Sequence, residues 1–104
     1  MENLKLQLLI YANVETEELY LVGNIKQLGA WDLKKAIKLT LCPKCGKYTV
    51  TKMLPKEEVV EFKVCKAQDW KFVEKGIWCE DIENHSFIVE KGLKVEIICH
   101  HFGA

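Results

Sequence analysis

The sequence predicts a single all-β domain, folded as an antiparallel sandwich or as a barrel. No segment shows the sustained 3.6-residue apolar periodicity of an amphipathic helix. About eight short segments instead alternate in hydropathy or are rich in β-branched residues, and turn residues separate them at regular spacing. With 104 residues, 49% of them hydrophobic, the chain has room for one core. We therefore treat residues 1–104 as one domain.

The clearest expected strand is residues 58–66. Val60, Phe62 and Val64 fall on one face of it, and the intervening residues fall on the other. Residues 91–92, Lys-Gly, suit a hairpin turn between the last two strands. In chain order, the expected strands are residues 4–11, 17–22, 36–41, 47–54, 58–66, a short extended segment at 70–73, 84–90 and 93–101, with a helical turn at 32–35 and an irregular connection at 74–83.

The charge composition argues against a nucleic-acid partner. The chain carries fifteen basic and fifteen acidic residues, and every basic residue is a lysine. Nucleic-acid and phosphate sites usually depend on arginine forks and a basic stripe. No apolar run approaches the roughly 20 residues that cross a bilayer, and the N-terminus lacks the basic start and apolar core of a signal peptide. We therefore expect no nucleic-acid partner, no membrane partner and a cytoplasmic location.

The loop from Gly23 to Asp32 is the most informative stretch. Gly23 and Gly29 can adopt backbone angles that other residues avoid, so the chain can turn sharply on both sides of Leu28. Leu28 is expected to anchor the loop on the body of the domain, which leaves Trp31 at the surface. An indole held on a rigid loop is a flat platform for a ligand.

The three tryptophans all flank loops. A loop tryptophan is more often a partly buried cap on a sandwich than a ligand platform. Two of them, Trp31 and Trp70, flank the strand that carries Glu61 and Lys63, and this arrangement favours a binding site. A pyranose ring has an apolar C–H face that fits an indole and a hydroxyl edge that fits ammonium and amide groups. The pattern therefore suits an uncharged sugar.

The loop and the segment after it resemble the opening of a family-20 carbohydrate-binding module, the starch-binding domain. In that family a strand ending in Val-Gly leads to Leu-Gly-x-Trp and then to Ala-Val-x-Leu, and residues 19–32 and 35–39 follow this order. Later segments are similar to the family's central strand with its Leu-Pro turn, its Glu-Tyr-Lys strand, the tryptophan after it and its Asn-Arg-x-Phe closure. These are residues 48–55, 61–63, 70 and 84–87.

The resemblance implies an immunoglobulin-like antiparallel β-sandwich of seven or eight strands that binds starch or glycogen and has neither catalytic residues nor a cofactor. It implies that such a module tethers an associated enzyme or regulator, such as a covalently linked catalytic domain, to α-glucan. Carried over by motif, the carbohydrate-binding residues are Trp31, Lys63, Trp70 and Asn84. Tyr48 occupies the place where many members have a second-site tryptophan. Trp78, in a connection longer than in many members, is the other candidate for a second site.

The alternative interpretation is a protein-interaction β-sandwich stabilised by zinc. Cys42 and Cys45 form a tight turn that can direct two thiolates at one ion. A closed site needs two more ligands, and Cys65 has glutamine where its own partner would stand. The five cysteines form an odd set, which, together with the missing signal peptide, favours reduced thiols in a plain turn. We therefore expect no bound metal.

No enzymatic site is expected. Cys99 and His100 are neighbours in a predicted strand, so their side chains point to opposite faces and cannot act as a nucleophile and its base. The acidic residues are spread over turns and outward faces, and no pair is placed for glycoside hydrolysis.

Overall fold

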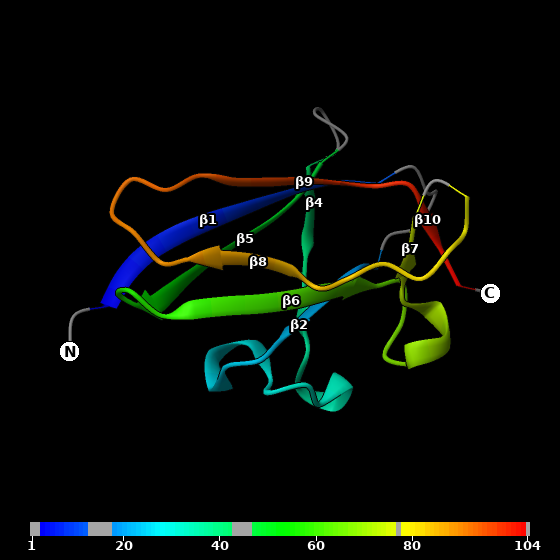
Figure 1. Cartoon of the computed structure of the whole chain (residues 1–104), viewed down its shortest axis with the longest axis horizontal. Helices are drawn as coiled ribbons and strands as arrows, with labels where there is room; N and C mark the ends of the chain where they lie inside the picture. The colour runs from blue at the N-terminus through cyan, green and yellow to red at the C-terminus, as the bar shows by residue number, and fades with distance from the viewer. Residues whose placement is uncertain (1–2, 13–17, 43–46, 77, 104) are drawn as a thin grey trace.

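Two four-stranded sheets pack face to face, and a third, two-stranded sheet lies at one end of the sandwich (Figure 1). The computed structural model describes residues 3–12, 18–42, 47–76 and 78–103. Its strands are β1 (Asn3–Ala12), β2 (Tyr20–Gly23), β3 (Ile37–Lys38), β4 (Thr40–Cys42), β5 (Lys47–Pro55), β6 (Val59–Cys65), β7 (Glu74–Lys75), β8 (His85–Ile88), β9 (Val95–Cys99) and β10 (His101–Phe102). Its 3₁₀ helices are η1 (Lys26–Leu28), η2 (Leu33–Lys35) and η3 (Trp70–Phe72). None of the described helices is long and apolar enough to span a bilayer.

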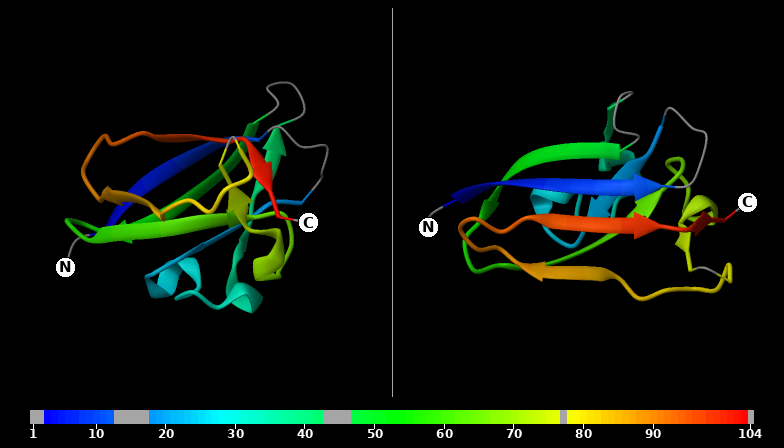
Figure 2. Two further views of the ribbon diagram at one scale, coloured as in Figure 1. Left: turned by 45° about the vertical axis from the view of Figure 1, so that its right-hand side comes forward. Right: turned by 90° about the horizontal axis from the view of Figure 1, so that it is seen from above.

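The predicted all-β sandwich is confirmed, with one pair of strands that runs parallel. The first sheet has the order β4-β5-β1-β9 and the second has the order β3-β2-β6-β8. Strand β1 is antiparallel to β5 but parallel to β9, where Leu8 pairs with Val95. Figure 2 shows β1 and β9 side by side. The described part of the chain has ten named strands rather than seven or eight, because short pieces such as β3, β7 and β10 count separately.

The core fills the space between the two large sheets. Leu8 and Ile10 on β1 are fully buried, and Val60, Phe62 and Val64 on β6 are at most 1% exposed. The alternation predicted for residues 58–66 is thus confirmed. Burying each such side chain contributes about 1.5–3 kcal/mol, so the facing residues of β1 and β6 stabilise the contact between the sheets.

The strand predicted at residues 36–41 is instead two short strands in different sheets. Strand β3 pairs with β2, whereas β4 pairs with β5. Between them Leu39 is 2% exposed, and its N–H donates to the Leu19 carbonyl oxygen at 2.8 Å. The chain therefore crosses from one sheet to the other at Leu39. The sequence did not predict this crossing, because the alternation of apolar residues in 36–41 is the same for one strand with one partner as for two short strands with different partners.

Two other local predictions are wrong. Residues 70–72 form η3 rather than an extended segment, because the Asp69 side chain accepts a hydrogen bond from the Lys71 N–H (3.0 Å) and so caps the helix.

Residues 91–92 do form a turn, but β8 pairs with β6 while β9 pairs with β1. The turn therefore joins the two sheets and does not close a hairpin.

Candidate functional site

The outer face of the β3-β2-β6-β8 sheet carries a second, small set of buried apolar residues. Val22 on β2, Leu33 in η2 and Cys65 on β6 are at most 7% exposed, although the first and last point away from the main core. Trp31 and Val73 pack against them. The segments around η1, η2 and η3 lie over this face (Figure 1). We call Val22, Leu33 and Cys65 the outer cluster, and it forms the base of the site.

Two glycines shape the loop that precedes Trp31, for different reasons. Gly29 has a φ of +90°, in the left-handed region that glycine adopts readily. A Cβ on Gly23 would lie 2.7 Å from Leu28 Cδ1 and 2.8 Å from the Glu61 carbonyl oxygen. Gly23 is therefore required by close packing and not, as predicted, by the backbone angles of a turn. Leu28 is fully buried, which confirms its role as the anchor of the loop.

The backbone that presents Trp31 is strained. Ala30 and Trp31 have φ values of +48° and +64°, a region that costs non-glycine residues about 1–2 kcal/mol each. The Trp31 N–H donates to the Gly23 carbonyl oxygen (2.9 Å), and the Ala30 N–H donates to the Ile25 carbonyl oxygen (3.0 Å). These bonds hold the strained backbone from which the indole projects, and the indole itself packs on the outer cluster.

A single side chain links the two tryptophan-bearing segments. Gln68 Nε2 donates to the Leu33 carbonyl oxygen at 3.1 Å, and so joins the residues before η3 to η2. The indoles of Trp31 and Trp70 lie with their ring centroids 6.3 Å apart and their planes inclined by 46°. Trp70 is 43% exposed and Trp31 is partly buried. Gln68 could not be predicted, because no local sequence pattern marks a side chain whose partner is a distant backbone carbonyl.

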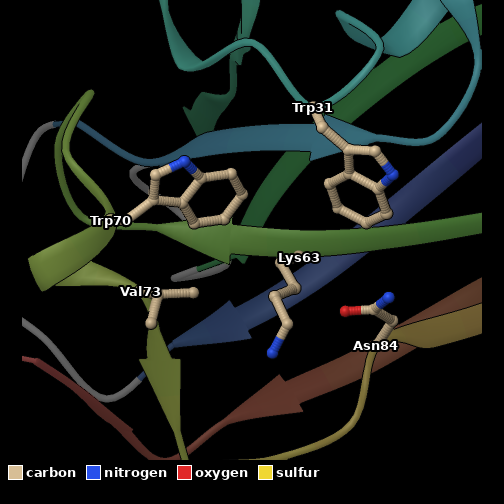
Figure 3. A pocket seen from close by; sticks show the side chains of 5 residues that line it. All are labelled: Trp31, Lys63, Trp70, Val73 and Asn84. Atoms are coloured by element: carbon tan, nitrogen blue, oxygen red, sulfur yellow. The ribbon is translucent and has the colours of Figure 1, made fainter.

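The four residues selected by motif lie together. Trp31, Lys63, Trp70 and Asn84, with Val73, line an open depression of about 280 Å³. Figure 3 shows the two indoles above Lys63, with Val73 to the left of the lysine and Asn84 to its right. The volume is at the lower end of the range for small-molecule sites and suits part of an oligosaccharide. Val73 was not predicted, since it reaches the site only because η3 turns the chain back towards β6.

The ammonium group of Lys63 is positioned by the backbone. Its Nζ donates to the Ile82 carbonyl oxygen at 2.7 Å. An ammonium group has three N–H donors, so this bond orients Lys63 without using its whole capacity. The same bond holds the segment leading to Asn84 against β6.

A buried contact ties together the two segments that carry Val73 and Asn84. Glu74, the residue after Val73, is 3% exposed, and its Oε1 lies 2.7 Å from Nε2 of His85, the residue after Asn84. Burial, together with the neighbouring Glu74, raises the pKa of the Cys99 thiol well above its ordinary value. Near neutral pH this thiol is therefore protonated and not a nucleophile.

The two candidates for a second site differ completely in exposure. Tyr48 on β5 is 2% exposed and is part of the main core. The expectation that Tyr48 offers a second platform is therefore corrected: in β5 its side chain points inward, opposite Ile10 of β1. Trp78 is 83% exposed, in the connection between β7 and β8.

The zinc interpretation depends on a turn that the structure does not describe. Cys45 lies outside the described residues, and Cys42 is partly buried at the end of β4. Within the described ranges, no three His, Cys, Asp or Glu side chains gather closely enough to hold a metal ion.

A family model and several solved structures match this chain. The family model described as the starch binding domain matches residues 4–98. No curated protein sequence matches the chain. Among solved structures, the family 20 module of the maltotetraose-forming amylase from Pseudomonas saccharophila STB07 is 21% identical, with a TM-score of 0.69, and the match covers 91% of this chain and 99% of that one.

Larger enzymes contain similar domains. The Hormoconis resinae glucoamylase is 20% identical with a TM-score of 0.70, and the match covers 98% of this chain and 18% of the glucoamylase. The gamma-CGTase from alkalophilic Bacillus clarkii is 21% identical with a TM-score of 0.68, and the match covers 92% and 14% of the two chains. At such identities the structures show a shared fold, and the family model covers nearly all of the chain. The chain therefore belongs to the starch binding domain family, the family-20 carbohydrate-binding modules.

Proposed function

We propose that this domain binds α-glucan, such as starch or glycogen, by stacking sugar rings on Trp31 and Trp70, and that it does not cleave its ligand. The observation that carries the proposal is the pair of partly exposed indoles, 6.3 Å apart, beside a lysine and an asparagine in one depression. Membership of a family of non-catalytic starch-binding modules supports a polysaccharide as the ligand.

The chemistry of the depression suits a sugar chain. An indole face attracts the C–H face of a pyranose through dispersion and through its negative quadrupole. The Lys63 ammonium and the Asn84 amide can bond to the hydroxyl edge of the same ring. The 46° inclination between the indoles favours a chain that bends from one sugar to the next. An α-1,4-linked glucan bends in this way, whereas a β-1,4-linked glucan is a flat ribbon.

The expected affinity is modest. Covering about 100 Å² on each of two sugar rings contributes about 5 kcal/mol before costs are subtracted. Loss of translational and rotational freedom removes several kcal/mol of this sum and of the hydrogen-bond contribution. We expect the stacking and hydrogen-bond contributions together to exceed this cost by about 4–7 kcal/mol, which corresponds to a dissociation constant of about 1 mM to 10 µM. Binding of this strength suits a domain that holds an associated enzyme or regulator on a polysaccharide with many sites. The amylase, glucoamylase and CGTase relatives support a linked catalytic domain as that partner.

Calorimetric titration with β-cyclodextrin and maltoheptaose tests the proposal. We expect Trp31→Ala and Trp70→Ala each to weaken binding at least tenfold, because each removes about half of the stacking area. Trp70 is the more decisive position, since its 43% exposure means that its removal leaves the fold intact. Met53→Ala, at an exposed position on the other sheet, is the matched control. Wild-type affinity in both tryptophan variants, with circular dichroism unchanged, would show that the site lies elsewhere.

A further inference from the structure

One acidic side chain is buried beside the depression without lining it. Glu74 follows Val73 and is 3% exposed, and no other charged side chain of the described residues is buried as deeply. Removing a carboxylate from water is costly unless the carboxylate is paired. Its partner is His85, whose Nε2 lies 2.7 Å from Glu74 Oε1. An apolar pair of similar size would hold the two segments together at least as well, so a directional pair calls for another explanation.

Glu74 is held in place by the backbone around it. Strand β7 pairs with β10, where Glu74 stands opposite Phe102. The Val73 carbonyl oxygen accepts a hydrogen bond from the Gly103 N–H at 2.9 Å, and Val73 also forms a bridge with Cys65 of β6. The carboxylate therefore projects from a backbone that two neighbours fix, and it can serve as a reference point for a less constrained segment.

Asn84 has less support of its own. It lies just before β8 and outside the pairing of that strand with β6, and its side chain is exposed. Within the ranges that the structure describes, no hydrogen bond reaches the Asn84 amide group. The direction of this amide therefore depends on its backbone, which the contacts of neighbouring residues hold.

Two side-chain contacts fix the backbone on either side of Asn84. Before it, the Ile82 carbonyl oxygen accepts a hydrogen bond from Lys63 Nζ at 2.7 Å. After it, the His85 ring contacts Glu74. The first contact leaves one residue between the anchor and Asn84, whereas the second begins at the adjacent residue. The contact of His85 is therefore the closer constraint.

The His85 ring lies on the inner face of β8. His85 stands opposite Phe62 of β6, and the centroids of the two rings are 5.2 Å apart. Consecutive side chains of an extended segment point to opposite faces, so an inward ring at position 85 directs Asn84 outward to the depression. Packing on Phe62 limits the depth of the ring, and the bond to Glu74 also fixes its rotation, because an N–H must point at its acceptor.

We propose that Glu74 and His85 are positioning residues for sugar binding, whose contact fixes the direction of Asn84 and thereby raises the affinity of the depression; this inference rests on the function proposed above. Neither residue lines the depression. Their effect on a ligand passes through the backbone that joins His85 to Asn84. An apolar pair would hold the segments together without fixing this direction, so the two roles can be separated by substitution.

The first experiment measures thermal unfolding and separates cohesion from positioning. His85→Phe keeps a ring against Phe62 but leaves Glu74 buried and unpaired, and we expect the thermal midpoint to fall by about 10 °C or more. The double variant Glu74→Met/His85→Phe replaces the pair by apolar groups, and we expect its midpoint to return to within about 5 °C of the wild type. His100→Phe, at an exposed position, is the matched control.

Calorimetry with β-cyclodextrin then shows whether affinity returns with stability. We expect the double variant to bind about fivefold more weakly than the wild type, which is the cost of one misdirected hydrogen bond. His85→Gln places an amide N–H where the imidazole N–H stands, and should therefore lose less affinity than the double variant. Wild-type affinity in the folded double variant would overturn this inference and leave the proposed function standing. A wild type that does not bind β-cyclodextrin would overturn the proposed function itself.

Nuclear magnetic resonance tests the positioning without any ligand. The heteronuclear NOE of a side-chain amide reports its motion on the picosecond-to-nanosecond scale, and the variant Asn84→Asp identifies the Asn84 signal by removing it. We expect this NOE to fall in Glu74→Met/His85→Phe. The amide of Asn24, which bonds to the backbone of β6 in the same sheet, is the internal control and should keep its value. An unchanged NOE for Asn84 in the double variant would contradict the positioning role.

Discussion

The two places where this domain exposes indoles are built in opposite ways. Trp31 packs on the outer cluster and is placed by a loop whose anchor, Leu28, is fully buried. Trp78 has an 83% exposed side chain and is held by hydrogen bonds of the turn backbone and of Glu80. The geometry of the depression is therefore coupled to the stability of the whole domain. The orientation of Trp78 can change with little effect on the fold.

The largest effect is expected from Leu28→Ala. Leu28 belongs to the main core and lies against Gly23, beneath the loop that carries Trp31. Removing a buried leucine side chain lowers the free energy of unfolding by about 2–5 kcal/mol. We expect this loss in urea denaturation, together with loss of β-cyclodextrin binding. The exposed control Ile98→Ala should change the free energy by less than about 0.5 kcal/mol. An unchanged unfolding free energy in Leu28→Ala would mean that the loop is anchored by another residue.

Alkaline pH is expected to destabilise the outer cluster. Burial raises the pKa of Cys65 to about 11 from its ordinary value of 9.0, although the nearby Lys63 opposes the shift. Between these values the unfolded chain loses the thiol proton and the folded chain keeps it. The stabilisation is therefore complete below pH 9 and is lost as the pH rises towards about 11. Over this interval Cys65 alone lowers the free energy of unfolding by about 1.4 kcal/mol per pH unit.

Urea denaturation at about pH 8 and about pH 10.5 measures this loss. Cys65→Ala should show a shallower decline than the wild type. Cys79→Ala, at an exposed position in the connection between β7 and β8, should keep the wild-type slope. Equal slopes in all three proteins would assign the alkaline transition to other groups, among them Cys99, whose pKa is also raised by burial.

A smaller effect is expected from Gln68→Ala. The variant loses the hydrogen bond to the Leu33 carbonyl oxygen that joins the two tryptophan segments, at a cost of about 1 kcal/mol in stability. Because the bond joins the two segments that carry the indoles, we expect its loss to loosen their mutual orientation and the β-cyclodextrin affinity to fall about threefold in calorimetry. Gln7→Ala, an exposed glutamine on β1, is the matched control. If Gln68→Ala keeps its affinity for β-cyclodextrin while its free energy of unfolding falls, packing on the outer cluster is sufficient to set the inclination between the two indoles.

The smallest effect is expected from Asp81→Asn. The Lys75 ammonium lowers the pKa of Asp81 through a hydrogen bond and its charge, but exposed ion pairs contribute little to stability. We expect no measurable shift in the thermal midpoint, measured by circular dichroism. A fall of several degrees would show that the exposed ion pair with Lys75 stabilises the connection between β7 and β8.

The residues of the depression could be selected from the sequence, but their arrangement could not. Trp31, Lys63, Trp70 and Asn84 stand in local motifs that one chain displays without an alignment, and the structure brings all four together. Whether they bind sugar stays a prediction. The segments that carry the indoles are joined by the bond from Gln68 to the Leu33 carbonyl oxygen, 35 residues away, so the 46° inclination of the rings is a tertiary property that no local motif displays.

Local patterns predicted strands better than they predicted the partners of those strands. The inward alternation of β6 followed directly from Val60, Phe62 and Val64. The split of residues 36–41 between two sheets did not, because Leu39 and its neighbours continue one apolar pattern across the change of partner. The Trp-Lys-Phe-Val run of residues 70–73 looks extended, and the overriding signal was the capping carboxylate of Asp69.

The parallel neighbour of β1 has a consequence for how the domain reaches its native state. Leu8 pairs with Val95, and Ala12 pairs with Cys99, so the first strand gains its second neighbour from residues near the far end of the sequence. Contacts between such distant positions form slowly, because the intervening chain must be ordered first. We expect refolding on a scale of about milliseconds to seconds. During synthesis, the first sheet stays incomplete at one edge until residue 99 has left the ribosome.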